Sequence, residues 1–177
     1  MDYASAMQWL YAQLPMYQRV GKAALNPNLD GITKLAEHLG NPHQKYKSIH
    51  IAGTNGKGSS AHMLASILQE AGYKVGLYTS PHLKDFSERI RINGVPIDRE
   101  YILDFVVSNR TFFEQEAFSF FEMTVGLAFD YFAKQQLDIA VIEVGLGGRL
   151  DATNIITPAA CLITNIALDH QQFLGTT

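Results

Sequence analysis

The stretch SIHIAGTNGKGSS, residues 48–60, decides the fold of this chain. Its first residues predict a short strand over 48–53. Small and polar residues follow, and a helix is expected over 58–71, ending at Gly72. Glycines between a strand and a helix let the backbone approach an anion, which the amide groups and dipole of the helix N-terminus attract. The stretch therefore predicts a phosphate-binding loop.

This loop departs from the general pattern G-x-x-x-x-G-K-[ST], in which the residue after the lysine ligates Mg²⁺. Ile51 replaces the first glycine, and Gly58 stands where the hydroxyl belongs. Lys57 can still reach the β- and γ-phosphates, and Ser59 is expected to cap the helix or to contact phosphate. The alternative is an ordinary turn with a solvated Lys57. The predicted nucleotide-binding residues are Gly53, Thr54, Asn55, Gly56, Lys57, Gly58, Ser59 and Ser60.

A second stretch, VIEVGLGGR at residues 141–149, places the carboxylate of Glu143 in an apolar run. A buried strand that ends in an acid is typical of a Walker B strand, whose carboxylate serves Mg²⁺. The glycines that follow predict a flexible turn beside the phosphate site. Alternatively, Glu143 is a strand-end acid paired with a nearby base. The presence of both stretches favours a nucleotide site.

The rest of the sequence alternates between predicted strands and helices. Strands are expected at residues 74–80, 137–145 and 160–166, with an Asn-Gly hairpin at 89–97. Helices are expected at residues 3–14, 29–40, 98–110 and 119–136, and an irregular loop at 15–28. This order predicts an α/β fold of the P-loop NTPase type, a mainly parallel sheet flanked by helices on both faces. Ligands of such sheets bind beyond the carboxyl ends of the strands, where Gly53, Ser80, Glu143 and the segment after Ile166 fall.

The composition is that of an ordinary globular chain. Of its 177 residues, 47% are hydrophobic and 18% are charged, and the formal net charge is −3. This balance gives no bulk attraction for nucleic acid or an anionic membrane, so neither is an expected partner. No signal peptide and no membrane-spanning apolar run is seen, which predicts a cytoplasmic protein. The single cysteine, Cys161, is expected to be buried.

Two signatures make the chain similar to a known family. IHIAGTNGKGSS (49–60) and VIEVGLGGRLDATNII (141–156) resemble those of the folylpolyglutamate synthase/dihydrofolate synthase family, in the Mur ligase superfamily. YTSPHL (78–83) and ALDHQQFLG (167–175) lie where that family has comparable segments. Gly58 favours the folate branch, because Mur ligases proper usually have Thr after the lysine of the loop.

The resemblance implies an ATP-dependent ligase. In that family a carboxylate of dihydropteroate or a folate attacks the γ-phosphate of ATP, and the amino group of L-glutamate then displaces phosphate. Two Mg²⁺ ions are implied, one held by Ser80 and Glu143, the other by His170 and Glu143. The implied catalytic residues are Lys57, Glu143 and His170. Without the resemblance, Ser80 is explained by turn chemistry before Pro81, and His170 by a helix cap or a surface position.

The same resemblance implies a pteroate pocket that includes Ser119, Phe121 and Asp151. Phe121 lies in the aromatic run AFSFFE and can instead be a core residue. Asp151 can instead pair with Arg149. These alternatives stay open at the level of sequence.

The chain stops after LDHQQFLGTT without a closing element, so residues 1–177 are expected to be the N-terminal part of an ATP-binding domain. The rest of that domain and a C-terminal glutamate-ligase domain would lie outside this sequence. This part alone is expected to be inactive, and the full-length protein to be a monomer. Two other functions stay open, a Mur-type ligase acting on a UDP-muramyl precursor and a nucleotide-binding module without catalysis.

Overall fold

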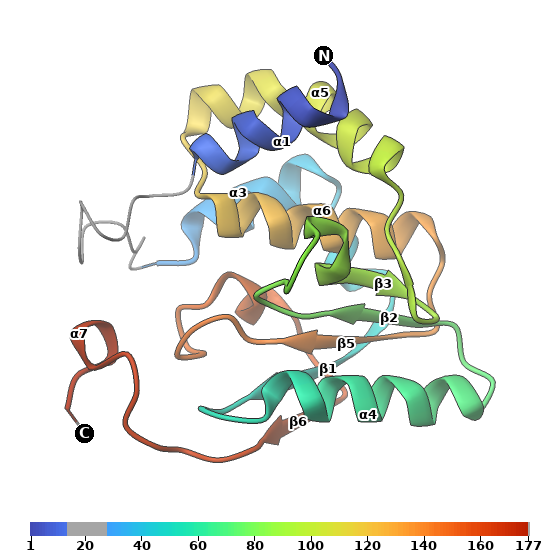
Figure 1. Cartoon of the computed structure of the whole chain (residues 1–177), viewed down its shortest axis with the longest axis vertical. Coiled ribbons are helices and arrows are strands. Elements are labelled where there is room, and N and C mark those ends of the chain that lie inside the picture. The colour runs from blue at the N-terminus through green and yellow to red at the C-terminus, as the bar shows by residue number, and fades with distance from the viewer. Residues whose placement is uncertain (14–27, 177) are drawn as a thin grey trace.

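A six-stranded sheet forms the centre of the computed structural model, which describes residues 1–13 and 28–176 (Figure 1). The strands are β1 (Lys47–Ala52), β2 (Val75–Tyr78), β3 (Ile90–Ile92), β4 (Val95–Pro96), β5 (Ile139–Glu143) and β6 (Ala160–Ile163). Their order in the sheet is β4-β3-β2-β5-β1-β6. β1, β2, β5 and β6 are parallel, whereas β3 pairs antiparallel with β2 and with β4. The predicted mainly parallel sheet is confirmed.

Helices cover both faces of this sheet, as the sequence predicts. They are α1 (Tyr3–Ala12), α3 (Asp30–His38), α4 (Lys57–Glu70), α5 (Arg99–Glu116), α6 (Phe120–Lys134) and α7 (Gln171–Leu174). Short 3₁₀ helices lie at Pro42–Gln44, Phe86–Arg89 and Ala152–Ile155. Figure 1 shows α4 on one face, α3 and α6 on the other, and α1 with α5 as an outer layer. Among the described helices, none is both long and apolar enough to span a bilayer.

The core is thickest between the sheet and α6. Tyr78, Phe129, Phe132 and Ile142 are fully buried there, because α6 lies between the sheet and the outer helices. This position explains why the sequence of α6 is apolar around most of its circumference. A smaller core lies beneath α4 and holds the phosphate loop's helix against the central strands.

One prediction about the edge strand β6 was wrong. All of its residues are exposed, including Cys161, which was expected to be buried. An apolar sequence identifies a strand, but burial also needs a layer on each face, and no described helix covers β6 as α4 and α6 cover the central strands. The loop predicted at 15–28 lies, except for Asn28, outside the described residues.

The connection between β2 and β3, residues 79–89, carries one of the predicted metal ligands and is fixed by a helix cap. The carboxylate of Asp85 accepts hydrogen bonds from the amide and the hydroxyl of Ser87, at 3.0 and 2.7 Å. Arg99 of α5 forms an ion pair with it, at 2.7 Å between Nη2 and Oδ2. The hydrogen bonds from Ser87, together with Arg99, lower the pKa of Asp85 from 3.8 to about 2.

We predict that Asp85→Asn lowers the free energy of unfolding at neutral pH and has little effect near pH 2. The pKa of Asp85 is lower in the folded protein than in the unfolded chain, so its ionised form stabilises the fold. That contribution is fully present above pH 3.8 and is lost as the pH falls to about 2. Urea unfolding of both proteins at several pH values measures it. A difference between the two proteins that persists unchanged below pH 2 would contradict the assignment.

Candidate functional site

The parallel strands bring the two sequence motifs to one edge of the sheet. Ile51 of β1 pairs with Glu143 of β5, and Tyr78 of β2 pairs with Ile142. The loops that follow these strands therefore leave the sheet side by side, as expected for ligand-binding loops of parallel sheets. The predicted meeting of the phosphate loop, the Ser80 loop and the end of β5 is present in the structure.

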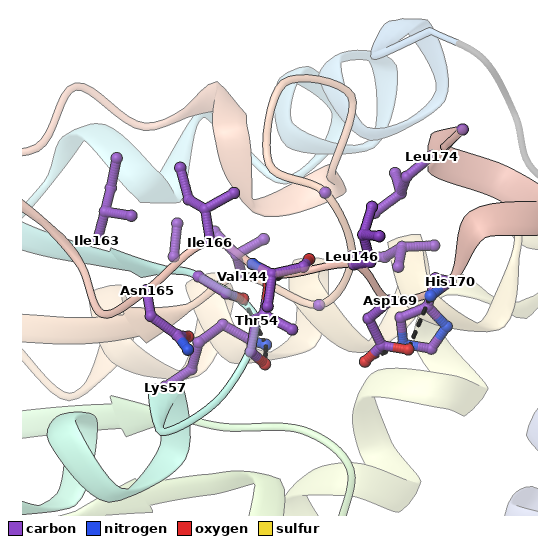
Figure 2. Close-up of a pocket in the computed structure, with 17 residues that line it drawn as sticks. Thr54, Lys57, Val144, Leu146, Ile163, Asn165, Ile166, Asp169, His170 and Leu174 are labelled. Carbon is purple, nitrogen blue, oxygen red and sulfur yellow. Dashed lines mark hydrogen bonds and ion pairs between the residues drawn. The ribbon is translucent and has the colours of Figure 1, made fainter. Parts of the chain in front are cut away.

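A pocket of about 250 Å³ lies at this edge (Figure 2). Thr54 and Lys57 of the phosphate loop line one part of it. Leu146 of the glycine-rich turn after β5 lines another part, and Asp169 and His170, beyond β6, a third. The pocket thus joins three segments that are far apart in the sequence.

The phosphate loop needs glycine at both ends. Gly56 precedes the first residue of α4 with φ 81°, a conformation that other residues rarely adopt. Gly53 has φ 132°, and a Cβ atom there would lie 2.1 Å from the Oγ1 atom of Thr164. The backbone can follow this path only because both positions lack side chains.

Two amide groups of the loop are already bonded to protein atoms. The amide of Thr54 donates to the carbonyl oxygen of Asn165 at 2.9 Å, and the amide of Asn55 donates to Asn165 Oδ1 at 2.8 Å. The amide groups in the first turn of α4, at Lys57, Gly58 and Ser59, have no partner within the helix. The groups that remain available to an anion are therefore at the start of α4. No side chain caps α4, so the expected cap by Ser59 is absent.

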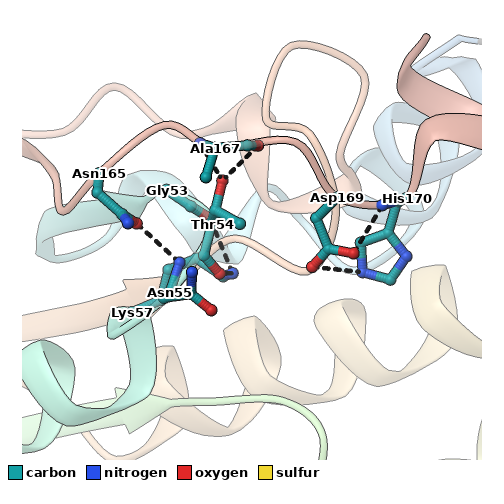
Figure 3. A network of polar contacts seen from close by, with 8 residues as sticks. All are labelled: Gly53, Thr54, Asn55, Lys57, Asn165, Ala167, Asp169 and His170. Carbon is teal, nitrogen blue, oxygen red and sulfur yellow. Dashed lines mark hydrogen bonds and ion pairs between the residues drawn. The ribbon is translucent and has the colours of Figure 1, made fainter. Parts of the chain in front are cut away.

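Lys57 folds back over the loop. Its Nζ atom donates to the carbonyl oxygens of Gly53 and Thr54, at 2.9 and 3.1 Å. These contacts hold the ammonium group against the loop and beside the pocket (Figure 3). The structure thus does not match the alternative of a fully solvated lysine.

Glu143 is the last residue of β5, and its side chain is buried, with 4% of the residue exposed. Its Oε2 atom accepts a hydrogen bond from the amide of Ser80 at 3.0 Å. A Cβ atom on Gly58 would lie 3.5 Å from the same oxygen, so the phosphate loop faces this carboxylate. Burial raises the pKa of Glu143, and the Ser80 amide and the charges of Lys57 and His62 partly oppose this shift.

The surroundings of Glu143 fit a magnesium ion. No group of three or more His, Cys, Asp or Glu side chains able to hold a metal is found in the described part of the chain. Mg²⁺ does not require such a cage, because it is commonly held by one or two carboxylates together with substrate phosphates and water. A buried carboxylate beside a phosphate loop, with glycine rather than a larger residue opposite it, suits this arrangement.

His170 is placed in the pocket but not beside Glu143. Its Nε2 atom is 3.8 Å from the Oδ2 atom of Asp169, and it precedes the short helix α7 with φ 47°. About half of the side chain is exposed. No contact between His170 and Glu143 is found among the described residues, so a metal shared by them stays a prediction.

Two of the three predicted pteroate residues, Phe121 and Asp151, lie near the turn after β5, and each of the three has a structural partner. Ser119 caps α6 through reciprocal hydrogen bonds with Glu122. Phe121 is half-buried against the core, and both Phe121 and Asp151 lie within 3.0 Å of a Cβ atom placed on Gly145. The structure therefore brings Phe121 and Asp151 together, while their contact with a ligand stays a prediction.

Asp151 does not pair with Arg149 in any described contact. Its carboxylate accepts from the amide of Leu146 at 2.7 Å and from the Thr153 hydroxyl at 2.5 Å. Because that hydroxyl donates its proton to Asp151, it accepts from Nε2 of buried His50, 2.8 Å away. Burial raises the pKa of Asp151, and its hydrogen bonds oppose the shift. The network ties β1 to the glycine-rich turn.

Sequence reasoning missed the residues directly after β6. Thr164 and Asn165 contact the phosphate loop more extensively than any residue of the predicted metal set. The signal available was two adjacent polar residues at the carboxyl end of an apolar strand, on the edge where the other functional loops were expected to meet.

We predict that Gly58→Ala folds normally but weakens Mg²⁺-dependent nucleotide binding. The added methyl group would make ordinary contacts, the nearest at 3.5 Å, and alanine favours a helix. It would, however, fill the space beside Glu143 that a metal and phosphate need. We expect a loss of about tenfold or more in affinity for an ATP analogue with Mg²⁺, or about 1.4 kcal/mol. Calorimetric titration of the full-length protein, with thermal unfolding as the control, measures it; unchanged affinity would show that the space is not used.

The Mur ligase middle domain family matches residues 51–177 of the chain. Folylpolyglutamate synthase of Lacticaseibacillus casei is 45% identical over 153 residues, covering 82% of this chain and 36% of that relative. Dihydrofolate synthase/folylpolyglutamate synthase of Bacillus subtilis is 39% identical over 182 residues, covering 99% of this chain and 41% of that relative. The chain therefore spans about two fifths of the length of these curated relatives.

The structure agrees with the sequence comparison. A solved FPGS–AMPPCP–folate complex matches 100% of this chain with a TM-score of 0.89 and 40% identity, over 43% of its own length. The resemblance seen in the two signatures is thus confirmed over both sequence and fold. The chain belongs to the Mur ligase middle-domain family, and its relatives include folylpolyglutamate and dihydrofolate synthases.

Proposed function

We propose that the protein to which this chain belongs is an ATP-dependent ligase that joins L-glutamate to the carboxylate of dihydropteroate or a folate. The observation that carries the proposal is the meeting of Gly58 and Ser80 at the buried carboxylate of Glu143. It occurs in a chain 40% identical to a protein solved with AMPPCP and folate. Residues 1–177 would be the N-terminal part of the ATP-binding domain.

The phosphates of ATP would bind at the first turn of α4. The amide groups of Lys57, Gly58 and Ser59 point out of the helix there, and the helix dipole favours an anion. The ammonium group of Lys57 lies within reach and would exchange its carbonyl contacts for phosphate oxygens. This exchange keeps the ammonium group hydrogen-bonded in both states.

The reaction proposed for this site has two steps. A carboxylate oxygen of the folate substrate attacks the γ-phosphorus of ATP, and the bond to the ADP oxygen breaks, giving an acyl phosphate. The amino nitrogen of glutamate then attacks the acyl carbon, the bond to phosphate breaks, and the nitrogen loses a proton. Lys57 would stabilise charge on the transferred phosphoryl group. Mg²⁺ bound at Glu143, beside Ser80, would supply further charge neutralisation when present.

Two features of the proposal rest on the family rather than on contacts. Phe121 and Asp151 would face the pteridine end of the substrate, and His170 would serve a second Mg²⁺. We also propose that the full-length protein is a cytoplasmic monomer; the net charge of −3 gives no bulk attraction for nucleic acid or an anionic membrane.

Two competing functions give different assay results. A Mur-type ligase would release phosphate only with a UDP-muramyl acceptor, and a non-catalytic nucleotide-binding module would show no glutamate-dependent turnover. The proposed ligase releases phosphate when glutamate and either dihydropteroate or tetrahydrofolate are both present. The comparison of these two acceptors also shows which folate reaction the protein performs.

We predict that Glu143→Gln in the full-length protein lowers kcat for glutamate ligation at least about a hundredfold, as removal of a key electrostatic group does. Glutamine still accepts the hydrogen bond from Ser80, so the fold should persist, which thermal unfolding checks. Ser80→Ala should raise the Mg²⁺ concentration needed for half-maximal activity more than Ser59→Ala does. Ser59→Ala serves as the matched control. Near-normal ligation by Glu143→Gln would refute the assigned role.

A further inference from the structure

The segment that follows β6 lies across the phosphate loop and is bonded to it at several points (Figure 3). We call residues 164–167 the strap. The Oγ1 atom of Thr164 donates to the carbonyl oxygen of Asn55, at 2.7 Å. Asn165 accepts from the amides of Thr54 and Asn55 with its carbonyl and side-chain oxygens. Each contact joins residues about a hundred positions apart in the sequence.

A reciprocal pair of hydrogen bonds joins the last residue of the strap to the phosphate loop. The hydroxyl of Thr54 donates to the carbonyl oxygen of Ala167 at 3.1 Å and accepts from its amide at 2.9 Å. Both hydrogen-bonding groups of one strap residue are thus satisfied by one side chain of the loop. In Figure 3 the side chain of Thr54 points at Ala167.

These bonds determine which amide groups of the loop remain available to a phosphate. The amides of Thr54 and Asn55 lie between the two end glycines of the loop, and the strap occupies both. The strap contacts thus leave the amides at the start of α4 for a phosphate. A loop held in its binding geometry before the ligand arrives spares the ligand the free energy of ordering it.

The strap also connects the phosphate loop to the residues that line the opposite part of the pocket. Ala167 is two residues before Asp169 and three before His170, and both of these line the pocket with Thr54. The Thr54–Ala167 pair therefore fixes the separation between the phosphate loop and the Asp169–His170 pair (Figure 2). Gly53 permits the close approach, since a Cβ atom there would collide with Thr164.

We propose that Thr54 and Asn165 are positioning residues that hold the phosphate loop in its ATP-binding conformation without contacting the phosphates. This inference rests on the proposed function, because it takes ATP as the ligand. It assigns Thr54 a different role from the phosphate contact predicted from the sequence. Thr164 and Ala167 complete the strap.

The test uses the full-length protein with three substitutions in the strap contacts and one control. Thr54→Val keeps the shape and removes both hydrogen bonds to Ala167, whereas Thr54→Ser keeps the hydroxyl. Asn165→Ala removes the acceptor for the Asn55 amide. Asn109→Ala, on α5, is the matched control, because it removes a half-buried asparagine side chain outside the pocket.

Two measurements separate positioning from direct contact. Amide hydrogen exchange without nucleotide should show the Thr54 and Asn55 amides protected in the wild type. Thr54→Val leaves the acceptor of the Asn55 amide unchanged. It should nevertheless lower the protection of that amide at least about tenfold, because two other hydrogen bonds that hold the loop are lost. In ligation assays Thr54→Val and Asn165→Ala should raise the KM for ATP about tenfold, with the KM for glutamate within about twofold. Thr54→Ser and Asn109→Ala should behave like the wild type.

The inference is overturned if Thr54→Val weakens ATP binding but leaves the protection at Asn55 intact, since Thr54 would then be a direct ligand. It is also overturned if protection is lost with no change in the KM for ATP, because the strap would then be only structural. Failure of the proposed function looks different: the wild type itself would show no binding of an ATP analogue. In that case the exchange data would still report whether the strap holds the loop.

Discussion

The hydrogen bond from the Ser80 amide to the buried carboxylate of Glu143 joins the two halves of the site. Glu143 ends the strand between β1 and β2, so the loops of both neighbours pass beside it. The carboxylate is costly to bury, as the raised pKa of Glu143 reflects. No described residue forms an ion pair with it within 4 Å. The proposed Mg²⁺ site accounts for this state, because a cation bound together with the nucleotide would offset the charge of the carboxylate.

The phosphate loop differs from the general pattern because its tasks are divided among neighbours. Gly58 supplies no hydroxyl, and the space that it leaves opens toward Glu143. The amide of Ser80 donates a hydrogen bond to the same carboxylate. The strap occupies the amides of Thr54 and Asn55, so the proposed anion-binding role falls to the start of α4. In the proposed site, metal, phosphate and loop geometry would therefore be controlled from three different strand ends.

Much of this could be predicted from the sequence because local patterns determine it. Apolar runs identify the strands, and parallel strands place their carboxyl ends at one edge of the sheet. The proximity of Ser80 and Glu143 could therefore be predicted. The polar residues after β6 could have been placed at this edge, but their bonds to the phosphate loop could not be predicted, because the partners are separated by about 110 residues. The prediction that Cys161 is buried was wrong, since burial depends on what covers β6. The Asp151 partners were also missed, because a hydroxyl rather than the adjacent Arg149 satisfies the carboxylate.

The most direct test of the central claim is a crystal structure of the full-length protein with Mn²⁺ and a non-hydrolysable ATP analogue. The anomalous signal of Mn²⁺ would locate the metal without reference to the protein atoms. We predict that the ion is bound by Glu143 beside Ser80, that the phosphates lie on the amides of the first turn of α4, and that Thr54 and Asn55 keep their bonds to the strap. A metal bound away from Glu143, or phosphates bound to the Thr54 and Asn55 amides, would contradict this account.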